Sequence, residues 1–350
     1  MTREIGFFPL VFVKLFFYNE SSETFRNELK YQEGIYSMRH CIGIDVGGTT
    51  IKFGLFQEDG ILLAKWDIPT KTEDRKEKLY QDMADSVRNE LKKHGMEVSE
   101  MIGVGVGIPG PVMPDGSISA LVNLGVYDLN LDKELPAYLD GVTVKAVNDA
   151  NAAALGELWQ GGGKGASSMA MLTLGTGVGC GIIEDGKLIV GSYGMGGECG
   201  HIIVNPDEPV ACNCGGHGCL EQYASATGIG RMGHRVLAES DAPSTLRKYE
   251  KLNAKNVLDA AKAGDALAIE TVDRCMKYLG LAMAYISHVT DPQCFVIGGG
   301  VSKAGQYLLD VLDGHYRKYV NVQKAKAELR LATLGNDAGI YGAARLILGE

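Results

Sequence analysis

The sequence predicts an α/β protein made of two similar halves around a cleft, with a metal-binding knuckle in the second half. Residues 41–56 and 169–183 each have the pattern of strand, turn of glycine and threonine, strand, and each leads into an acid-acid-glycine turn. Strand-like apolar runs and helical patterns follow both segments. Within residues 196–225, three cysteines fall within eight residues, at 212–219, and His201 lies just upstream of them. At 350 residues and 45% hydrophobic composition, the chain can bury a large core in two lobes.

The charge of the chain favours a small ligand over a nucleic acid. Its 34 basic and 43 acidic residues give a net charge of −9, and no dense block of lysine and arginine occurs. The 47 glycines cluster at strand ends, where they allow a ligand to approach the backbone closely. We therefore expect no nucleic-acid partner.

The first 37 residues differ from the rest of the chain. Their apolar run, residues 6–18, is thirteen residues long, which is too short to span a bilayer, and no small-residue cleavage site of a signal peptide follows it. Met38 stands directly before a strong strand pattern. We expect residues 1–37 to be an extension without a role in the core fold, no membrane partner, and a cytoplasmic location.

The turn in residues 41–56 offers groups that suit phosphate oxygens. Its glycines expose backbone N–H groups and its threonines add hydroxyls. Asp45, at the end of the first strand, is placed to hold Mg²⁺ through water. A glycine pair between strands is, taken alone, more often only structural. The candidates for nucleotide binding here are Asp45, Gly47, Gly48, Thr49, Thr50 and Lys52.

The second turn strengthens this interpretation because two phosphate loops facing each other would grip a nucleotide from both sides. Its candidate residues are Gly175, Thr176, Gly177, Val178 and Gly179. A further glycine run follows the buried strand pattern of residues 293–297 and contains Gly299 and Gly300. Adenine or ribose would fit against this backbone at the start of the next helix.

The segments between and after the turns follow helix and strand patterns. Residues 74–94 place apolar side chains four apart on one stripe, which predicts an amphipathic helix. Residues 101–108 and 142–147 are strand-like, and the second leads to Asn148 and Asp149 at the start of an alanine-rich helix. Two further helices are expected at residues 265–288 and 340–348.

Asp149 has two interpretations. An aspartate just before a helix is most often an N-cap. At the carboxyl end of a strand that opens toward a cleft, it can instead accept a hydroxyl proton during phosphoryl transfer. The flanking motifs favour the second interpretation.

The knuckle predicts a structural zinc site. His201, Cys212, Cys214 and Cys219 supply one nitrogen and three sulfurs, which fill a tetrahedron and leave no position open for water. A disulfide is the alternative, but Cys212 and Cys214 are too close in sequence for an easy bridge. His217 is a less favoured fourth ligand.

Two glutamates flank the knuckle. Glu198 lies three residues before His201, and Glu221 lies two residues after Cys219. Closing the metal site would bring their carboxylates together, where they suit the hydroxyls of a sugar. Solvated surface acids are the plainer alternative.

Taken together, these motifs resemble the ROK family of sugar kinases, and within it the bacterial glucokinases, from Arg39 to about Leu348. The resemblance implies two ribonuclease H-like lobes of the actin–hexokinase kind, residues 38–153 with 335–350 and residues 154–334. It implies Asp149 as the base and both turns as the site of MgATP. It also implies sugar contacts from Asn123, Asn148, Asp149, Glu198, His201 and Glu221. His201 would thus bind both zinc and the sugar. Cys199 departs from the family, which more often has a bulkier apolar residue at this position.

The expected reaction transfers the γ-phosphoryl group of ATP to the 6-hydroxyl of glucose. An N-acetylhexosamine, mannose or fructose kinase is the alternative, since these enzymes differ around one or two hydroxyls. A sugar-responsive repressor is the alternative of another class, but the basic helix-turn-helix features that it needs are missing ahead of Asp45. The sequence leaves the donor open between ATP and polyphosphate. The resemblance favours a homodimer or homotetramer.

Overall fold

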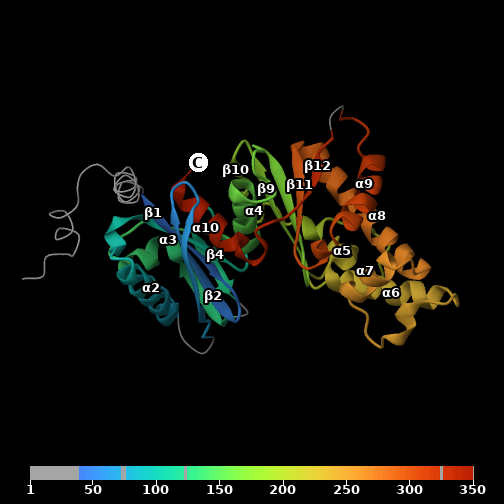
Figure 1. The fold of residues 1–350 in the computed structure, drawn as a ribbon, viewed down its shortest axis with the longest axis horizontal. Helices are drawn as coiled ribbons and strands as arrows, with labels where there is room; N and C mark the ends of the chain where they lie inside the picture. Colours follow the sequence, from blue (N-terminus) through green and yellow to red (C-terminus); the bar gives the residue numbers. More distant parts are fainter. Residues whose placement is uncertain (1–38, 72–75, 122–123, 324–325, 350) are drawn as a thin grey trace, which may run out of the picture. The chain divides into compact units, whose positions relative to one another are not determined.

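The computed structural model describes residues 39–71, 76–121, 124–323 and 326–349 (Figure 1). Residues from His40 onward form one compact unit. The predicted extension, residues 1–37, and the predicted sugar contact Asn123 lie outside the described residues. Within the described ranges, no helix combines the length and the apolar composition needed to cross a membrane.

The first sheet has the strand order β3-β2-β1-β4-β7. Its strands are β1 (His40–Val46), β2 (Thr50–Gln57), β3 (Leu62–Pro69), β4 (Met101–Ile108) and β7 (Val144–Asn148). The first three are antiparallel neighbours, whereas β4 runs parallel to β1 and β7 runs parallel to β4. The inner strands β1 and β4 are almost wholly buried, and the edge strand β3 alternates toward solvent.

The second sheet repeats this arrangement with the order β10-β9-β8-β11-β12. Its strands are β8 (Met169–Leu174), β9 (Val178–Glu184), β10 (Lys187–Leu188), β11 (Cys294–Gly298) and β12 (Glu328–Leu331). Again the first three are antiparallel neighbours, and β8, β11 and β12 are parallel. The duplication predicted from the two glycine turns is therefore confirmed. A separate hairpin pairs β5 (Ser117–Leu121) with β6 (Val126–Asn130).

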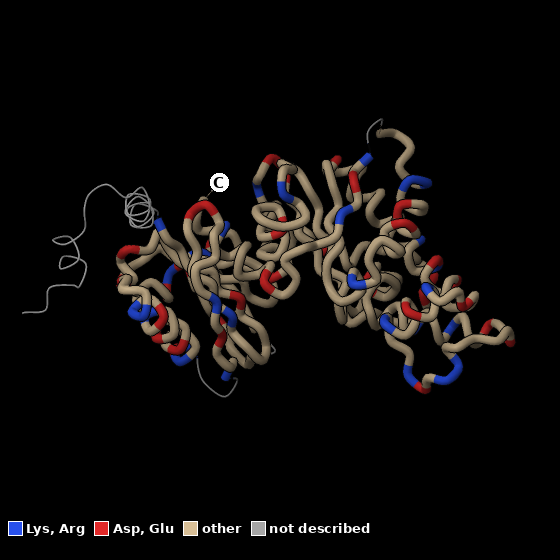
Figure 2. Tube along the Cα trace, in the orientation of Figure 1, with Lys and Arg blue, Asp and Glu red and all other residues tan. Residues whose placement is uncertain are grey.

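The helices pack around the two sheets (Figure 1). Their bounds are α2 (Lys76–Lys93), α3 (Leu131–Glu134), α4 (Asp149–Gln160), α5 (Glu221–Ala224), α6 (Ala226–Glu239), α7 (Ala254–Lys262), α8 (Ala266–Thr290), α9 (Gln306–Tyr319) and α10 (Ala338–Leu348). The buried side of α2 includes Leu79, Met83, Val87 and Leu91, which is the stripe that the sequence predicts. Helices α6 to α9 share one core with the second sheet, and α2 contributes to the core of the first. Basic and acidic residues are interspersed along the described chain (Figure 2).

Helices α4 and α10 pack against each other with their backbones almost in contact. A Cβ on Gly342 would overlap the carbonyl oxygen of Ala152, and one on Gly156 would overlap that of Ala338. Helix α10 approaches the first sheet just as closely, because a Cβ on Gly105 would overlap the carbonyl oxygen of Ala343. Glycine is therefore required at these crossings for steric reasons.

This packing predicts that Gly342→Ala destabilises the protein. The added methyl group meets backbone that cannot rotate away, so we expect a loss of about 2 kcal/mol or more in the free energy of unfolding, measured by urea denaturation. Gly314→Ala is the matched control: Gly314 lies in α9 with open space around its Cα, and alanine there should be neutral or stabilising by up to about 1 kcal/mol. Equal effects from the two substitutions would contradict the steric explanation.

Candidate active site

A cavity of about 570 Å³ is lined on one side by Asp45 and Lys52, which flank the first glycine turn, and on the other by residues of the second glycine turn. The predicted residues that line it are Asp45, Lys52, Asn148, Asp149, Gly175, Gly177, Val178, Gly179, Glu198, His201, Glu221 and Gly299. The predicted residues Gly47, Gly48, Thr49, Thr50, Thr176 and Gly300 are not among its lining residues. Of these, Gly48, Thr49, Thr176 and Gly300 are exposed.

The two glycine turns have similar local geometry. Gly47 donates its N–H to the carbonyl oxygen of Thr50 at 3.0 Å, and Gly175 donates to that of Gly177 at 3.0 Å. The first N–H of each turn is thus used to close the turn. The N–H groups that could donate hydrogen bonds to phosphate oxygens therefore belong to the following residues, among them the exposed Gly48, Thr49 and Thr176.

Asn148, and not Asp149, caps helix α4. The Asn148 side chain accepts hydrogen bonds from the N–H groups of Ala150 at 2.9 Å and Asn151 at 3.2 Å, and it donates to the carbonyl oxygen of Gly110 at 3.0 Å. Asp149 has one carboxyl oxygen 2.8 Å from the N–H of Ala150. Because Asn148 takes the capping role, the Asp149 carboxyl group faces the cavity and remains available for chemistry.

The surroundings of the two cavity aspartates raise their pKa values. Asp149 stays in contact with the solvent of the cavity, yet the surrounding protein removes part of its hydration, and this desolvation raises the pKa of its carboxyl group. Burial likewise raises the pKa of Asp45, with Asp149 adding to the rise and Lys52 opposing it. Lys52 Nζ lies 3.8 Å from Asp45 Oδ2. The two carboxylates thus act on each other across the cavity.

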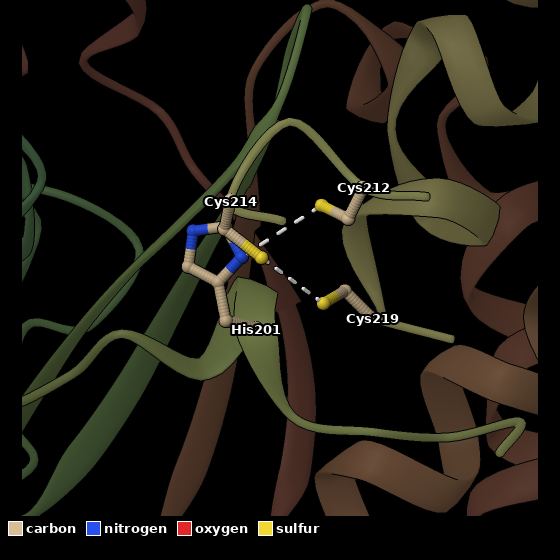
Figure 3. Close-up of side chains that lie close together, drawn as sticks. All are labelled: His201, Cys212, Cys214 and Cys219. Atoms are coloured by element: carbon tan, nitrogen blue, oxygen red, sulfur yellow. Dashed lines mark hydrogen bonds between the residues drawn. The ribbon is translucent and has the colours of Figure 1, made fainter. Parts of the chain in front are cut away.

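The predicted metal ligands form one cluster. The ligand atoms of His201, Cys212, Cys214 and Cys219 all lie within 4.8 Å of one another (Figure 3). Cys214 Sγ is 3.6 Å from Cys219 Sγ, and Cys212 Sγ is 4.0 Å from His201 Nδ1. A tetrahedron with Zn–S bonds of about 2.3 Å places its sulfurs about 3.8 Å apart, so the cluster fits zinc.

The structure shows neither of the two alternatives at the knuckle, a disulfide or His217 in the cluster. All eight cysteines lie within the described residues, and each has a free thiol. His217 is not part of the cluster: its Nδ1 lies 2.9 Å from the carbonyl oxygen of Glu208. This contact links the knuckle to the backbone of Glu208 and gives His217 a structural role that needs no metal.

Glu221 connects the knuckle to the second glycine turn. Its Oε2 accepts a hydrogen bond from the N–H of Val178 at 3.0 Å, and Oε1 lies 4.0 Å from Cys212 Sγ. A Cβ on Gly177 would overlap this carboxylate, so glycine is needed there for the approach. Together with Glu198 and His201 it forms a polar wall of the cavity.

An ion pair between the buried Glu208 and the half-buried Arg235 lies beside the knuckle. The Glu208 carboxylate accepts hydrogen bonds from Arg235 at 2.5 and 2.7 Å and from the Tyr223 hydroxyl at 2.5 Å. The Arg235 guanidinium lowers the pKa of Glu208 to about 2. These partners are 27 and 15 residues apart from Glu208 in sequence, so no local pattern predicts the pair.

Sequence reasoning missed one wall of the cavity. Gly335, Asn336, Ala338 and Gly339 line it, and the carbonyl oxygen of Asn336 accepts a hydrogen bond from Lys52 Nζ at 3.0 Å. The signal in the sequence was the glycine and asparagine that precede the helix expected at residues 340–348. The lining also includes Asn151, Thr173 and Cys180.

Comparison with known proteins places this geometry in context. A sequence model of the ROK family matches residues 41–350. Glucokinases of Halalkalibacterium halodurans and Thermotoga maritima are 43% and 38% identical to this chain, with 89% and 87% of this chain and 96% of each relative covered. An N-acetyl-D-glucosamine kinase of Vibrio atlanticus is 32% identical, with 87% of this chain and 98% of the relative covered.

Solved structures share the fold. A ROK hexokinase from Thermus thermophilus has a TM-score of 0.75 at 30% identity and covers 87% of this chain and 97% of its own. A ROK family glucokinase from Streptomyces griseus, solved with glucose and AMPPNP, has a TM-score of 0.67 at 32% identity, and the match covers 88% of this chain and 98% of that chain. The fold of this chain is therefore that of the ROK sugar kinases.

Proposed function

The chain belongs to the ROK family, and from this premise we infer that it is an ATP-dependent glucokinase that phosphorylates the 6-hydroxyl of glucose. The observation that carries the inference is the cavity, which holds Asp149, the polar wall of Glu198, His201 and Glu221, and residues of the second glycine turn. Glucokinase relatives cover nearly the whole described chain, which supports glucose as the sugar.

In the proposed mechanism the protein mainly positions the reactants. Glu198, His201 and Glu221 accept and donate hydrogen bonds to the sugar hydroxyls, and Asp149 takes the proton from the hydroxyl that attacks the γ-phosphorus. The exposed N–H groups of the two turns bind phosphate oxygens. Mg²⁺, for which the carboxylate of Asp45 is a suitable ligand through water, would neutralise phosphate charge when bound. The residues around Gly299 and Gly300 would receive the nucleoside.

Zinc is proposed as a structural ion in the His201 knuckle. The sulfur and nitrogen donors fit a closed tetrahedral site, and His201 belongs both to this cluster and to the cavity wall. In this proposal the ion supplies no chemistry. It fixes the backbone from which His201 and Glu221 reach the sugar.

Initial rates with ATP across glucose, mannose, fructose, N-acetylglucosamine and N-acetylmannosamine test the substrate. We expect kcat/KM to be largest for glucose. A higher value for an N-acetylhexosamine would favour the second candidate function, which the N-acetyl-D-glucosamine kinase relative supports. Replacing ATP with polyphosphate in the same assay tests the donor.

The acid limb of the pH profile is expected at a higher pH than an ordinary aspartate would give. Asp149 must be ionised to accept a proton, and desolvation raises its pKa, so kcat/KM should fall as the pH drops through a midpoint above the usual aspartate value of about 3.9. Circular dichroism over the same pH range controls for unfolding. A midpoint at or below the ordinary value would contradict this prediction.

A further inference from the structure

Within the described residues the chain crosses from one sheet to the other twice, and one buried carboxylate contacts both of these passages. The first passage runs from β7 through α4 to β8, and the second runs from β12 to α10, which packs against β1 and β4. Glu157 lies in the last turn of α4 and is fully buried.

Backbone N–H groups of both passages donate to the Glu157 carboxylate. Gly162, on the first passage, donates to Oε2 at 2.7 Å. On the second passage, Thr333 donates to Oε1 at 3.1 Å and to Oε2 at 3.0 Å, and Leu334 donates to Oε1 at 2.8 Å. A buried carboxylate that accepts several N–H groups holds them strongly, because each bond is charge-assisted.

The glycines after α4 make this arrangement sterically feasible. A Cβ on Gly161 would overlap the Glu157 carboxylate, and one on Gly162 would overlap the carbonyl oxygen of Leu331. The two passages therefore lie in direct backbone contact beside the carboxylate. A side chain at Gly162 would push them apart, and one at Gly161 would displace the Glu157 carboxylate.

The residues held by Glu157 lead directly into the cavity wall that sequence reasoning missed. Leu334 is followed by Gly335 and Asn336, which line the cavity, and the carbonyl oxygen of Asn336 binds Lys52 Nζ. Further along, Gly339 lies so close to Asp45 that a Cβ there would be 2.7 Å from its carboxyl carbon. A shift of this segment would therefore displace both Lys52 and Asp45.

We propose that Glu157 is a positioning residue for the nucleotide: by holding the N–H groups of Thr333 and Leu334, it sets the location of residues 335–339 beside Lys52 and Asp45. Glu157 is not among the residues that line the cavity, and it lies at the opposite end of α4 from Asp149. The sugar wall of Glu198, His201 and Glu221 belongs to other segments, so the effect should fall on ATP. The inference rests on the proposed function, which assigns ATP to this cavity.

Hydrogen exchange of the wild-type protein without substrates is the first test. The amides of Gly162, Thr333 and Leu334 should exchange slowly although they lie outside helices and strands. Glu157→Gln should speed their exchange at least tenfold, because the side-chain NH₂ of glutamine cannot accept hydrogen bonds from the backbone N–H groups that face it. Glu184→Gln, an exposed carboxylate at the end of β9, is the matched control and should leave these amides unchanged. Rapid exchange of the three amides in the wild type would overturn the proposal.

Steady-state kinetics is the second test. We expect Glu157→Gln to raise KM for ATP about tenfold and to change KM for glucose less than twofold, with Glu157→Asp intermediate because it keeps the charge. An equal rise in both KM values would indicate general loosening and would overturn the proposal, as would unchanged values. If the wild type phosphorylates no sugar with ATP, the proposed function fails, and hydrogen exchange still decides whether Glu157 anchors the two passages.

Discussion

An Asp149→Asn variant is expected to bind glucose normally and to lose about 100- to 10,000-fold in kcat, the range typical of removing a general base. The substitution keeps the shape of the side chain, but an amide cannot take the proton of the sugar hydroxyl. Helix α4 should be unaffected because Asn148 supplies its cap, with hydrogen bonds to the N–H groups of Ala150 and Asn151. Calorimetry with glucose and initial rates with saturating ATP measure the two quantities.

The control for Asp149 is another aspartate with the same substitution. Asp185 lies in the exposed turn between β9 and β10 with a φ of 48°, a conformation that asparagine also adopts readily. Asp185→Asn should retain wild-type kcat and glucose affinity. If Asp149→Asn keeps kcat within tenfold of wild type, another group is the base and the assignment is wrong.

The parts of this site that sequence alone could predict depend on local contacts. The two glycine turns, the strand before Asp149 and the spacing of the knuckle cysteines are each local patterns in the sequence. The structure brings Asp45, Asp149, most of the second turn and His201 of the knuckle to one cavity. The duplication of the sheets followed from the same local pattern. Turn chemistry and side-chain periodicity are properties of neighbouring residues, so they can be read without the fold.

The parts that could not be predicted depend on long-range contacts. Glu157 bonds the N–H of Thr333, which is 176 residues away in sequence, and Lys52 bonds the carbonyl oxygen of Asn336 across 284 residues. Nothing in the residues around a glutamate near the end of a helix distinguishes a buried anchor from a solvated side chain. Whether Asp149 caps helix α4 could not be decided from sequence either, because the residue before it, an asparagine, caps helices equally well.

Removal of the knuckle metal is expected to weaken glucose binding much more than nucleotide binding. In the proposed site His201 is both a zinc ligand and a residue of the polar wall. Glu221 accepts a hydrogen bond from the N–H of Val178, and its other carboxyl oxygen lies 4.0 Å from Cys212 Sγ, so loosening the cluster should displace this wall. We expect Cys214→Ala to raise the Kd for glucose at least tenfold, with the Kd for AMPPNP changed less than about threefold, and to lower Tm by several degrees. Calorimetry with each ligand and thermal unfolding are the measurements.

The zinc content of each variant must be measured alongside these affinities. Elemental analysis should find one zinc ion per chain in the wild type and little or none in Cys214→Ala. The control Cys275→Ala, which removes a buried thiol of α8 far from the cluster in sequence, should also keep one zinc ion per chain. Loss of both zinc and glucose affinity in Cys214→Ala would tie the ion to the polar wall, because the proposed nucleotide side of the cavity is formed by Lys52, Asp45 and the segment after β12 instead. The prediction would be contradicted by unchanged glucose affinity in protein verified to be free of zinc, or by full activity without any metal. In either case the metal would not be needed for sugar binding, and the protein fold alone would position His201 and Glu221.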